Sequence, residues 1–196
     1  MKSTLGRSAL VVAALLTVPL AHAVEVRYFA LLTGAAENPD VVTTGSGSVD
    51  VTYDDATHLM RVRSVFSGLL GNTTVAHIHC CQVDPSQNAG VATTTPTFLG
   101  FPAGVTAGAF DQTYDMSLAS SYNPAFIANT PGVTVALAEA RLFTGMANGG
   151  AYFNIHSSLF GGGEIRGTLK VPEPSALALV ALSLVGVAVV SRRRPS

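Results

Sequence analysis

Residues 48–54 read SVDVTYD, and in this stretch the apolar side chains of Val49, Val51 and Tyr53 alternate with polar ones. Successive side chains of a β-strand point to opposite faces, so this period of two predicts a strand with one buried and one exposed face. Short strands of this kind, separated by Gly- and Asn-rich turns, indicate an antiparallel sandwich or barrel. Further strands are predicted at 26–32, 60–64, 73–79, 151–156 and 164–169.

Two other segments lack this alternation. Residues 136–146 are dominated by Ala, Leu, Glu and Arg, which favour helix, so we expect at most one short helix there. Residues 82–108 contain many Thr, Pro and Gly and show little periodicity. We expect a long loop in this region, and long loops in compact domains are often functional.

The first 23 residues are typical of a secretory signal peptide. A basic head carrying Lys2 and Arg7 precedes an apolar stretch at 9–20. Small residues at Ala21 and Ala23 then form a site suited to signal peptidase. The alternative is a retained anchor helix, but a span needs about 20 apolar residues and this stretch is shorter. We expect the mature chain to begin near residue 24.

The other end of the chain, 171–196, has three parts. A Pro-Glu-Pro triplet is followed by an uncharged segment at 175–191 and then by three arginines. A helix over that segment rises roughly 25 Å, just short of the usual hydrocarbon thickness. The arginines are expected to stay on the cytoplasmic side, with the body of the protein outside. The residues of the triplet and the basic cluster are Pro172, Glu173, Pro174, Arg192, Arg193 and Arg194.

This tail resembles the PEP-CTERM sorting signal of Gram-negative bacteria. The resemblance implies a transient inner-membrane anchor, processing by an exosortase-type membrane protease, and delivery to the cell surface or the extracellular matrix. A plain C-terminal anchor is the alternative. Either interpretation places the body of the protein outside the cytoplasm.

The segment between the two ends, 24–170, has a length that suits one domain with its own core. It contains six Lys and Arg residues and eleven Asp and Glu residues, so its net charge is about −5. It shows no basic patch of the kind that nucleic-acid-binding domains carry. We therefore expect no nucleic-acid partner.

Several short segments of this domain together resemble the CHRD domain, which was first named from chordin. The resemblance implies an all-β fold, an immunoglobulin-like antiparallel β-sandwich, over 24–170. It implies no activity, and we expect a non-enzymatic binding or structural module whose ligand is a surface polysaccharide or another surface protein. The matching segments are 35–39 (AAENP), 66–69 (FSGL), 76–79 (AHIH), 100–102 (GFP), 151–156 (AYFNIH) and 162–167 (GGEIRG).

Three histidines could carry chemistry. His77 and His79 are two apart on a predicted strand, so their imidazoles should lie on one face. If His156 lies near them, the three rings would suit zinc or copper. We favour the interpretation that the rings act as hydrogen-bonding groups that fix loops, with metal binding as the alternative. A small extracellular redox enzyme that uses such a metal, or a thiol, is a further alternative.

Cys80 and Cys81 are the only cysteines and are adjacent. In an oxidising compartment two cysteines normally pair, so we favour a vicinal disulfide. Soft metal ligation and disulfide exchange with a partner are the alternatives.

Three charged residues of the domain are interpreted from their position alone. Glu37 lies in a predicted loop, where we expect a solvated acid. Glu164 and Arg166 share a strand face, so they could pair with each other or with the histidines.

Overall fold

The computed structural model describes residues 25–82, 84 and 87–172. The predicted signal peptide, its cleavage residues, the hydrophobic helix and the sorting residues from Glu173 onward lie outside the described residues. Within the described part of the chain, no helix is long and apolar enough to span a bilayer.

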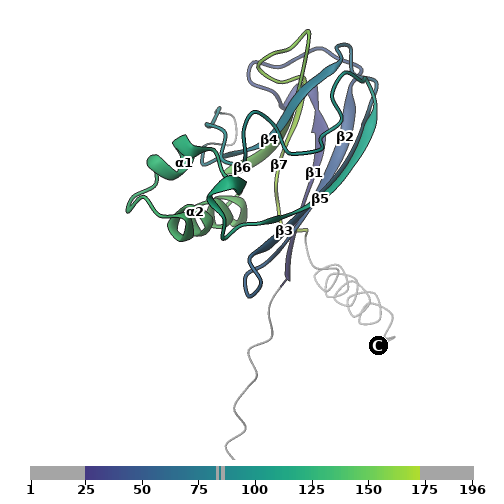
Figure 1. Cartoon of the computed structure of the whole chain (residues 1–196). Helices are drawn as coiled ribbons and strands as arrows, with labels where there is room; N and C mark the ends of the chain where they lie inside the picture. Colours follow the sequence, from purple (N-terminus) through teal and green to yellow (C-terminus); the bar gives the residue numbers. More distant parts are fainter. Residues whose placement is uncertain (1–24, 83, 85–86, 173–196) are drawn as a thin grey trace, which may run out of the picture.

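The prediction of an all-β fold is confirmed. The strands form one continuous sheet, and its curl is consistent with the predicted sandwich. This sheet is antiparallel, has the order β4-β6-β7-β1-β2-β3-β5, and curls into a half-barrel (Figure 1). All six predicted strands are present within a few residues of their predicted bounds. The strands are β1 (Glu25–Thr33), β2 (Ser46–Asp54), β3 (Leu59–Ser67), β4 (Thr73–Cys80), β5 (Gly108–Asp115), β6 (Ala151–Ser157) and β7 (Ile165–Thr168).

Strand β5 was not predicted. Only Phe110 of its eight residues is buried, and the exposed residues around it are mixed rather than alternating. The strand pairs through its whole length with β3, from Gly108 opposite Phe66 to Asp115 opposite Leu59. Its place is therefore set by the neighbouring strand and not by a periodicity of its own.

The inner face of the curled sheet forms the hydrophobic core. The alternating residues predicted at Val49, Val51 and Val62 point into it and are almost completely buried. Ile78 and Phe153 continue the same face on β4 and β6. Burying each side chain of this size contributes about 1.5–3 kcal/mol, so this face provides most of the stability of the fold.

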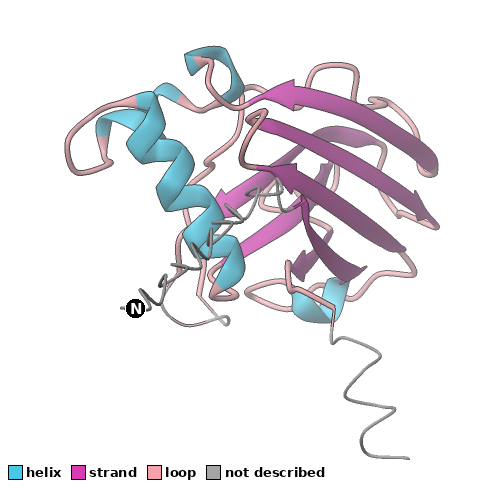
Figure 2. Cartoon of the chain, turned by 90° about the horizontal axis from the view of Figure 1, so that it is seen from below, coloured by secondary structure: helices cyan, strands magenta, loops and turns pink. Residues whose placement is uncertain are grey.

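Helix α2 (Val135–Ala147) confirms the predicted helix and lies beside the sheet (Figure 2). Its N-cap is Thr134, whose hydroxyl accepts from the backbone N–H of Leu137. Phe143 stacks on Tyr53, so the helix also packs against the end of β2. A single-turn helix, α1 (Pro124–Ala128), and two short 3-10 turns, η1 (Gly34–Ala36) and η2 (Ala119–Ser121), were not predicted.

Cys80 and Cys81 are joined in a disulfide at the end of β4. Helix α2 crosses this disulfide at Gly145, where an added Cβ would lie 2.3 Å from the Cys80 Sγ and 2.7 Å from the Cys81 Sγ. Glycine at this position lets the helix backbone approach the two sulfur atoms closely.

The predicted long loop follows β4 and runs back along its free edge. The backbone N–H of Cys80 donates to the carbonyl of Gly90, the N–H of Ala92 donates to Ile78, and that of Phe98 donates to Ala76. The loop hydroxyls of Thr93 and Thr97 accept from two further N–H groups of β4. The segment therefore replaces a neighbouring strand for β4.

Candidate metal centre

The outer face of the sheet carries polar side chains, and on β4 and β6 these include the three histidines. His77 and His79 alternate with Ala76 and Ile78, which point into the core. Antiparallel pairing places Asn154 of β6 opposite His77, and His156 is two residues further along the same face. The pairing of the two strands therefore brings His156 to the other two rings.

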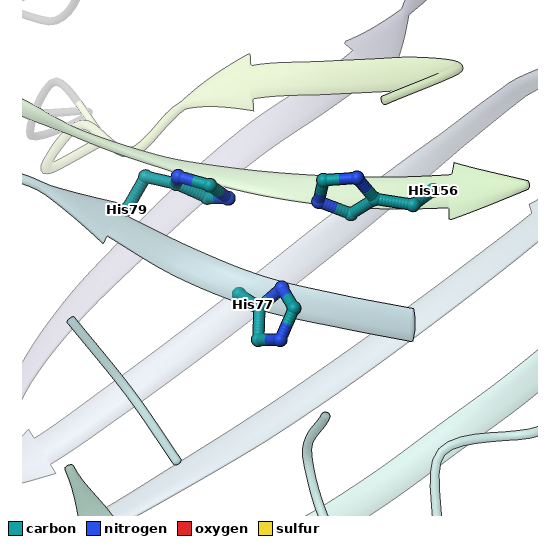
Figure 3. Close-up of side chains that lie close together, drawn as sticks. All are labelled: His77, His79 and His156. Atoms are coloured by element: carbon teal, nitrogen blue, oxygen red, sulfur yellow. The ribbon is translucent and has the colours of Figure 1, made fainter. Parts of the chain in front are cut away.

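The three imidazoles form one cluster (Figure 3). The ring centroid of His77 lies 5.8 Å from that of His79 and 5.5 Å from that of His156. The ring centroids of His79 and His156 are 5.8 Å apart. One ring nitrogen of each lies within 4.8 Å of the others. Three ligands at the usual zinc–nitrogen distance of about 2.0–2.1 Å lie at most about 4 Å apart. A closure of about 1 Å would therefore let the rings share one ion.

Each ring uses one nitrogen to hold a backbone carbonyl. The Nε2–H of His77 donates to the carbonyl of Pro96 at 2.6 Å. The Nδ1–H of His79 donates to Ala89, and the Nδ1–H of His156 donates to Gly161, both at 2.9 Å. A carbonyl only accepts, so these bonds fix which nitrogen carries the hydrogen in each neutral ring.

The second nitrogen of each ring is buried and makes no hydrogen bond: Nδ1 of His77, Nε2 of His79 and Nε2 of His156. In the tautomers fixed by the carbonyls, all three of these nitrogens carry a free lone pair. Buried polar atoms are nearly always satisfied, and three unsatisfied acceptors in one cluster need an explanation. Metal-binding histidines show this division of labour, with one nitrogen on the ion and the other on a backbone or carboxylate oxygen.

Burial also keeps the three rings neutral. None of the three residues is more than 8% exposed. Loss of solvation lowers the pKa of all three imidazoles, and that of His79 falls to about 4. A neutral imidazole is the form that binds a metal ion, so the rings are ready to act as ligands at neutral pH.

His79 is held by a stack of side chains. Its ring lies parallel to that of Tyr152 at 4.8 Å, and the guanidinium of Arg166 lies 4.6 Å from the centre of the same Tyr152 ring. The Tyr152 hydroxyl accepts from the backbone N–H of Ala89, whose carbonyl holds His79. Sequence reasoning missed the role of Tyr152, although the residue lies within the segment 151–156 that resembles the CHRD domain.

The interpretation of Glu37 as a solvated loop acid was wrong, because Glu37 is only 6% exposed. It lies beside Arg166, with its Oε2 at 3.9 Å from the Arg166 Nε. Burial raises the pKa of Glu37 to about 7, while the nearby Arg166 charge and the Asn154 amide act in the opposite direction. The tight 3-10 turn after β1 carries the acid onto the outer face of the sheet.

Among the described residues, Glu164 and Arg166 have different partners and do not pair with each other, which was one of the two alternatives. Arg166 donates to the Ala36 carbonyl and to the Asn88 side chain. Glu164 accepts from the backbone N–H groups of Leu70 and Gly71 and thus fixes a turn. Neither charged group forms a hydrogen bond with the three histidines, whose ring partners are backbone carbonyls.

The sulfur atoms are not part of the histidine cluster. Cys80 follows His79 on β4, so its side chain points to the opposite face and joins the core. Both sulfurs are engaged in the disulfide. Among the described residues, the cluster that could hold a metal ion therefore consists of imidazoles alone.

Comparison with protein families agrees with this architecture. A model of the CHRD domain matches residues 28–169, which is most of the chain. The chain belongs to the CHRD family. The CHRD match begins within β1 and ends after β7, so it includes all three histidines and the whole sheet except the first three residues of β1.

A model of the PEP-CTERM protein-sorting motif matches residues 170–194, directly after the CHRD domain. This motif indicates export in a Gram-negative bacterium, processing by an exosortase-type system and a place at the cell surface. No curated protein and no solved structure matches the chain.

Proposed function

We propose that this CHRD domain is a non-enzymatic module of the cell surface that binds one zinc or copper ion between His77, His79 and His156. The observation that carries the proposal is the set of three buried ring nitrogens that have no hydrogen-bond partner. Three neutral imidazoles suit either metal, and copper(II) binds such nitrogen sites more tightly than zinc. A fourth coordination position remains for water or another ligand.

A purely structural role explains only one of the two nitrogens of each histidine ring. A histidine that joins two loops by hydrogen bonds uses both ring nitrogens, one as donor and one as acceptor. In this cluster all three rings donate to a carbonyl and none uses its acceptor. An ion at the centre of the cluster would accept all three lone pairs at once.

Export supports a binding role outside the cytoplasm. In the proposed sequence of events, the tail first holds the precursor in the inner membrane, and processing then releases the CHRD domain toward the surface or the matrix. A metal ion that joins three imidazoles from two strands would stabilise the domain after release. The fourth position would be filled by water or another small ligand, because the rings are buried.

The proposal is tested by measuring the metal content of the mature protein. The full precursor is expressed in an exporting Gram-negative host, and the mature protein is purified without chelators and analysed by elemental mass spectrometry. We expect about one zinc or copper ion per chain, and less than about a tenth of that in a His77→Ala/His79→Ala variant. His58→Ala removes a histidine that lies outside the cluster and should leave the metal content unchanged.

The melting temperature gives a second readout. A ligand that binds only the folded state at 100 times its Kd stabilises a protein by about 2.7 kcal/mol. Zinc or copper should therefore raise the melting temperature of the wild type and of His58→Ala, but not that of the double variant. Purified protein that contains no metal, and whose melting temperature neither metal raises, would leave the histidines as hydrogen-bonding groups. Turnover of superoxide or of a thiol substrate by the metal-loaded protein would support a redox enzyme instead.

A further inference from the structure

The last backbone pairing of the CHRD domain lies directly beside its sorting motif. The N–H of Phe29 on β1 donates to the carbonyl of Lys170 at 2.8 Å, and the N–H of Lys170 donates back to Phe29 at 3.1 Å. The match to the sorting motif begins at Lys170, and its Pro-Glu-Pro triplet begins at Pro172. Only Val171 separates the sheet from that triplet.

This arrangement limits how far the triplet can lie from the domain. An extended chain spans at most about 3.6 Å per residue, so Pro172 lies within about 7 Å of the last paired residue. A protease that binds an extended segment around the triplet must therefore touch the surface next to Lys170. The linker is too short for the enzyme to act at a distance from the folded domain.

The surface next to Lys170 is apolar. Phe29 is 37% exposed, Leu31 is 68% exposed and Val171 is 51% exposed. Together with Thr168 and Pro172 they line a shallow groove with a volume of about 460 Å³. Elsewhere the outer faces of β1, β2 and β3 carry paired charges, including Arg27, Asp50 and Arg63. An exposed apolar patch with a polar border is typical of an interaction site.

We infer that Phe29, Leu31 and Val171 form the surface on which the sorting protease docks when it processes the tail. This docking patch rests on the processing by an exosortase-type enzyme that the sorting motif indicates. The inference therefore assigns to this membrane protein an apolar contact area beside its active site, which would match the exposed apolar side chains of the patch. Docking adds to the recognition of the tail sequence and makes the folded CHRD domain part of the substrate.

The test follows removal of the tail from the full precursor in cells that contain the protease, by pulse labelling and mass measurement. We expect Phe29→Ser/Leu31→Ser to slow processing by roughly five- to tenfold, which corresponds to about 1.0–1.4 kcal/mol of lost contact. Leu118→Ser/Leu159→Ser removes two leucines of similar exposure, 52% and 65%, that do not line the groove. This control should be processed at the wild-type rate.

A second pair of precursors separates docking from folding. Twelve Gly and Ser residues are inserted between Val171 and Pro172, in the wild type and in the patch variant. The longer linker lets the protease reach the triplet without touching the patch, so the two inserted forms should be processed at equal rates. Slower processing of the patch variant with the insertion as well would mean impaired folding or export, and would overturn the inference.

Two other results would also overturn docking on the protease. One is processing of the patch variant at the wild-type rate without the insertion. The other is the same normal processing of the patch variant combined with weaker attachment of that variant to membranes. This result would make the lipid surface the partner of the patch. A wild-type precursor that keeps its tail would instead contradict the sorting itself, on which the inference rests.

Discussion

Apart from the apolar patch around Phe29 and Leu31, the outer face of the sheet is mostly polar, but its two halves have different surroundings. On β1, β2, β3 and β5 the charged side chains face solvent, as in the pair of Arg61 and Asp111, which are each 49% exposed. On β4, β6 and β7 three loops cover the face, and Arg166 has a side-chain exposure of only 4%. The same alternation of residues thus produces a solvated charged surface in one half and a buried polar layer in the other.

The difference shows what a covered polar face requires. On the open half a charged group is solvated by water, so its partner contributes little. On the covered half every polar group depends on fixed partners, because burial without them costs several kcal/mol for a charge and about 1–3 kcal/mol for a neutral group. Four substitutions test this contrast.

The largest effect is expected for Arg166→Ala. The substitution removes two hydrogen bonds and the contact with Tyr152, and it leaves the carboxyl of Glu37 without its neighbouring charge. Removing one partner of a buried pair costs about 3–5 kcal/mol. We expect urea denaturation to show a loss of about 3 kcal/mol in the free energy of unfolding. A loss below about 1 kcal/mol would mean that the covered layer behaves like the open surface.

The next largest effect is expected for Gly163→Ala. Gly163 has a φ of +127°, and an added Cβ would lie 2.4 Å from the Asn154 Nδ2 and 2.7 Å from the Glu37 Oε1. Strained backbone and overpacking together should cost about 2–3 kcal/mol in thermal or urea denaturation. Gly161→Ala is the matched control in the same turn, because a Cβ at that position meets no atom within 4 Å. Equal effects of the two substitutions would refute the packing argument.

Glu37→Gln should change the dependence of stability on pH. The folded protein raises the pKa of Glu37 to about 7 from an ordinary value of 4.5, so the folded state binds more protons between these values. This contribution to stability is complete below pH 4.5 and is lost as the pH rises through 7. Glutamine stays neutral, so the variant should gain about 2–2.5 kcal/mol relative to wild type between pH 5 and pH 8. A constant difference across this range would contradict the raised pKa.

The smallest effect is expected for Arg61→Ala on the open half. Arg61 donates to both carboxylate oxygens of Asp111 at 2.7 and 2.6 Å, but both side chains are half exposed. An exposed pair of this kind contributes little to stability, and salt screens it. The loss measured at low salt should therefore shrink in 1 M NaCl. A loss as large as that of Arg166→Ala would remove the distinction between the two halves.

The sequence predicted the strands well because each has an inner face that must be apolar. The apolar side chains at alternate positions in β2 show this requirement directly: they are Val49, Val51 and Tyr53. The prediction that the His77 and His79 side chains lie on one face followed from the same period of two. Strand β5 has a single buried residue, Phe110, so its sequence shows no alternation of apolar and polar residues.

The rest of the site depends on contacts between distant segments, which no local pattern contains. His156 reaches the other two rings through the register of β4 and β6. The carbonyls of Ala89, Pro96 and Gly161 fix the ring tautomers, and any residue type can supply a carbonyl. Glu37 has the local sequence of a solvated turn acid and is buried only because of how its turn packs against β7.

The loop that runs back along β4 has a consequence for contacts between copies of this chain. A bare edge strand presents unpaired N–H and C=O groups that can join the edge strand of another molecule. Here the loop occupies N–H groups of Ala76, Ile78 and Cys80, together with carbonyls of Ala76 and Ile78. These groups are therefore not available for pairing with a strand of another molecule at this edge. The segment that holds two of the three imidazoles in place thus also covers one edge of the sheet.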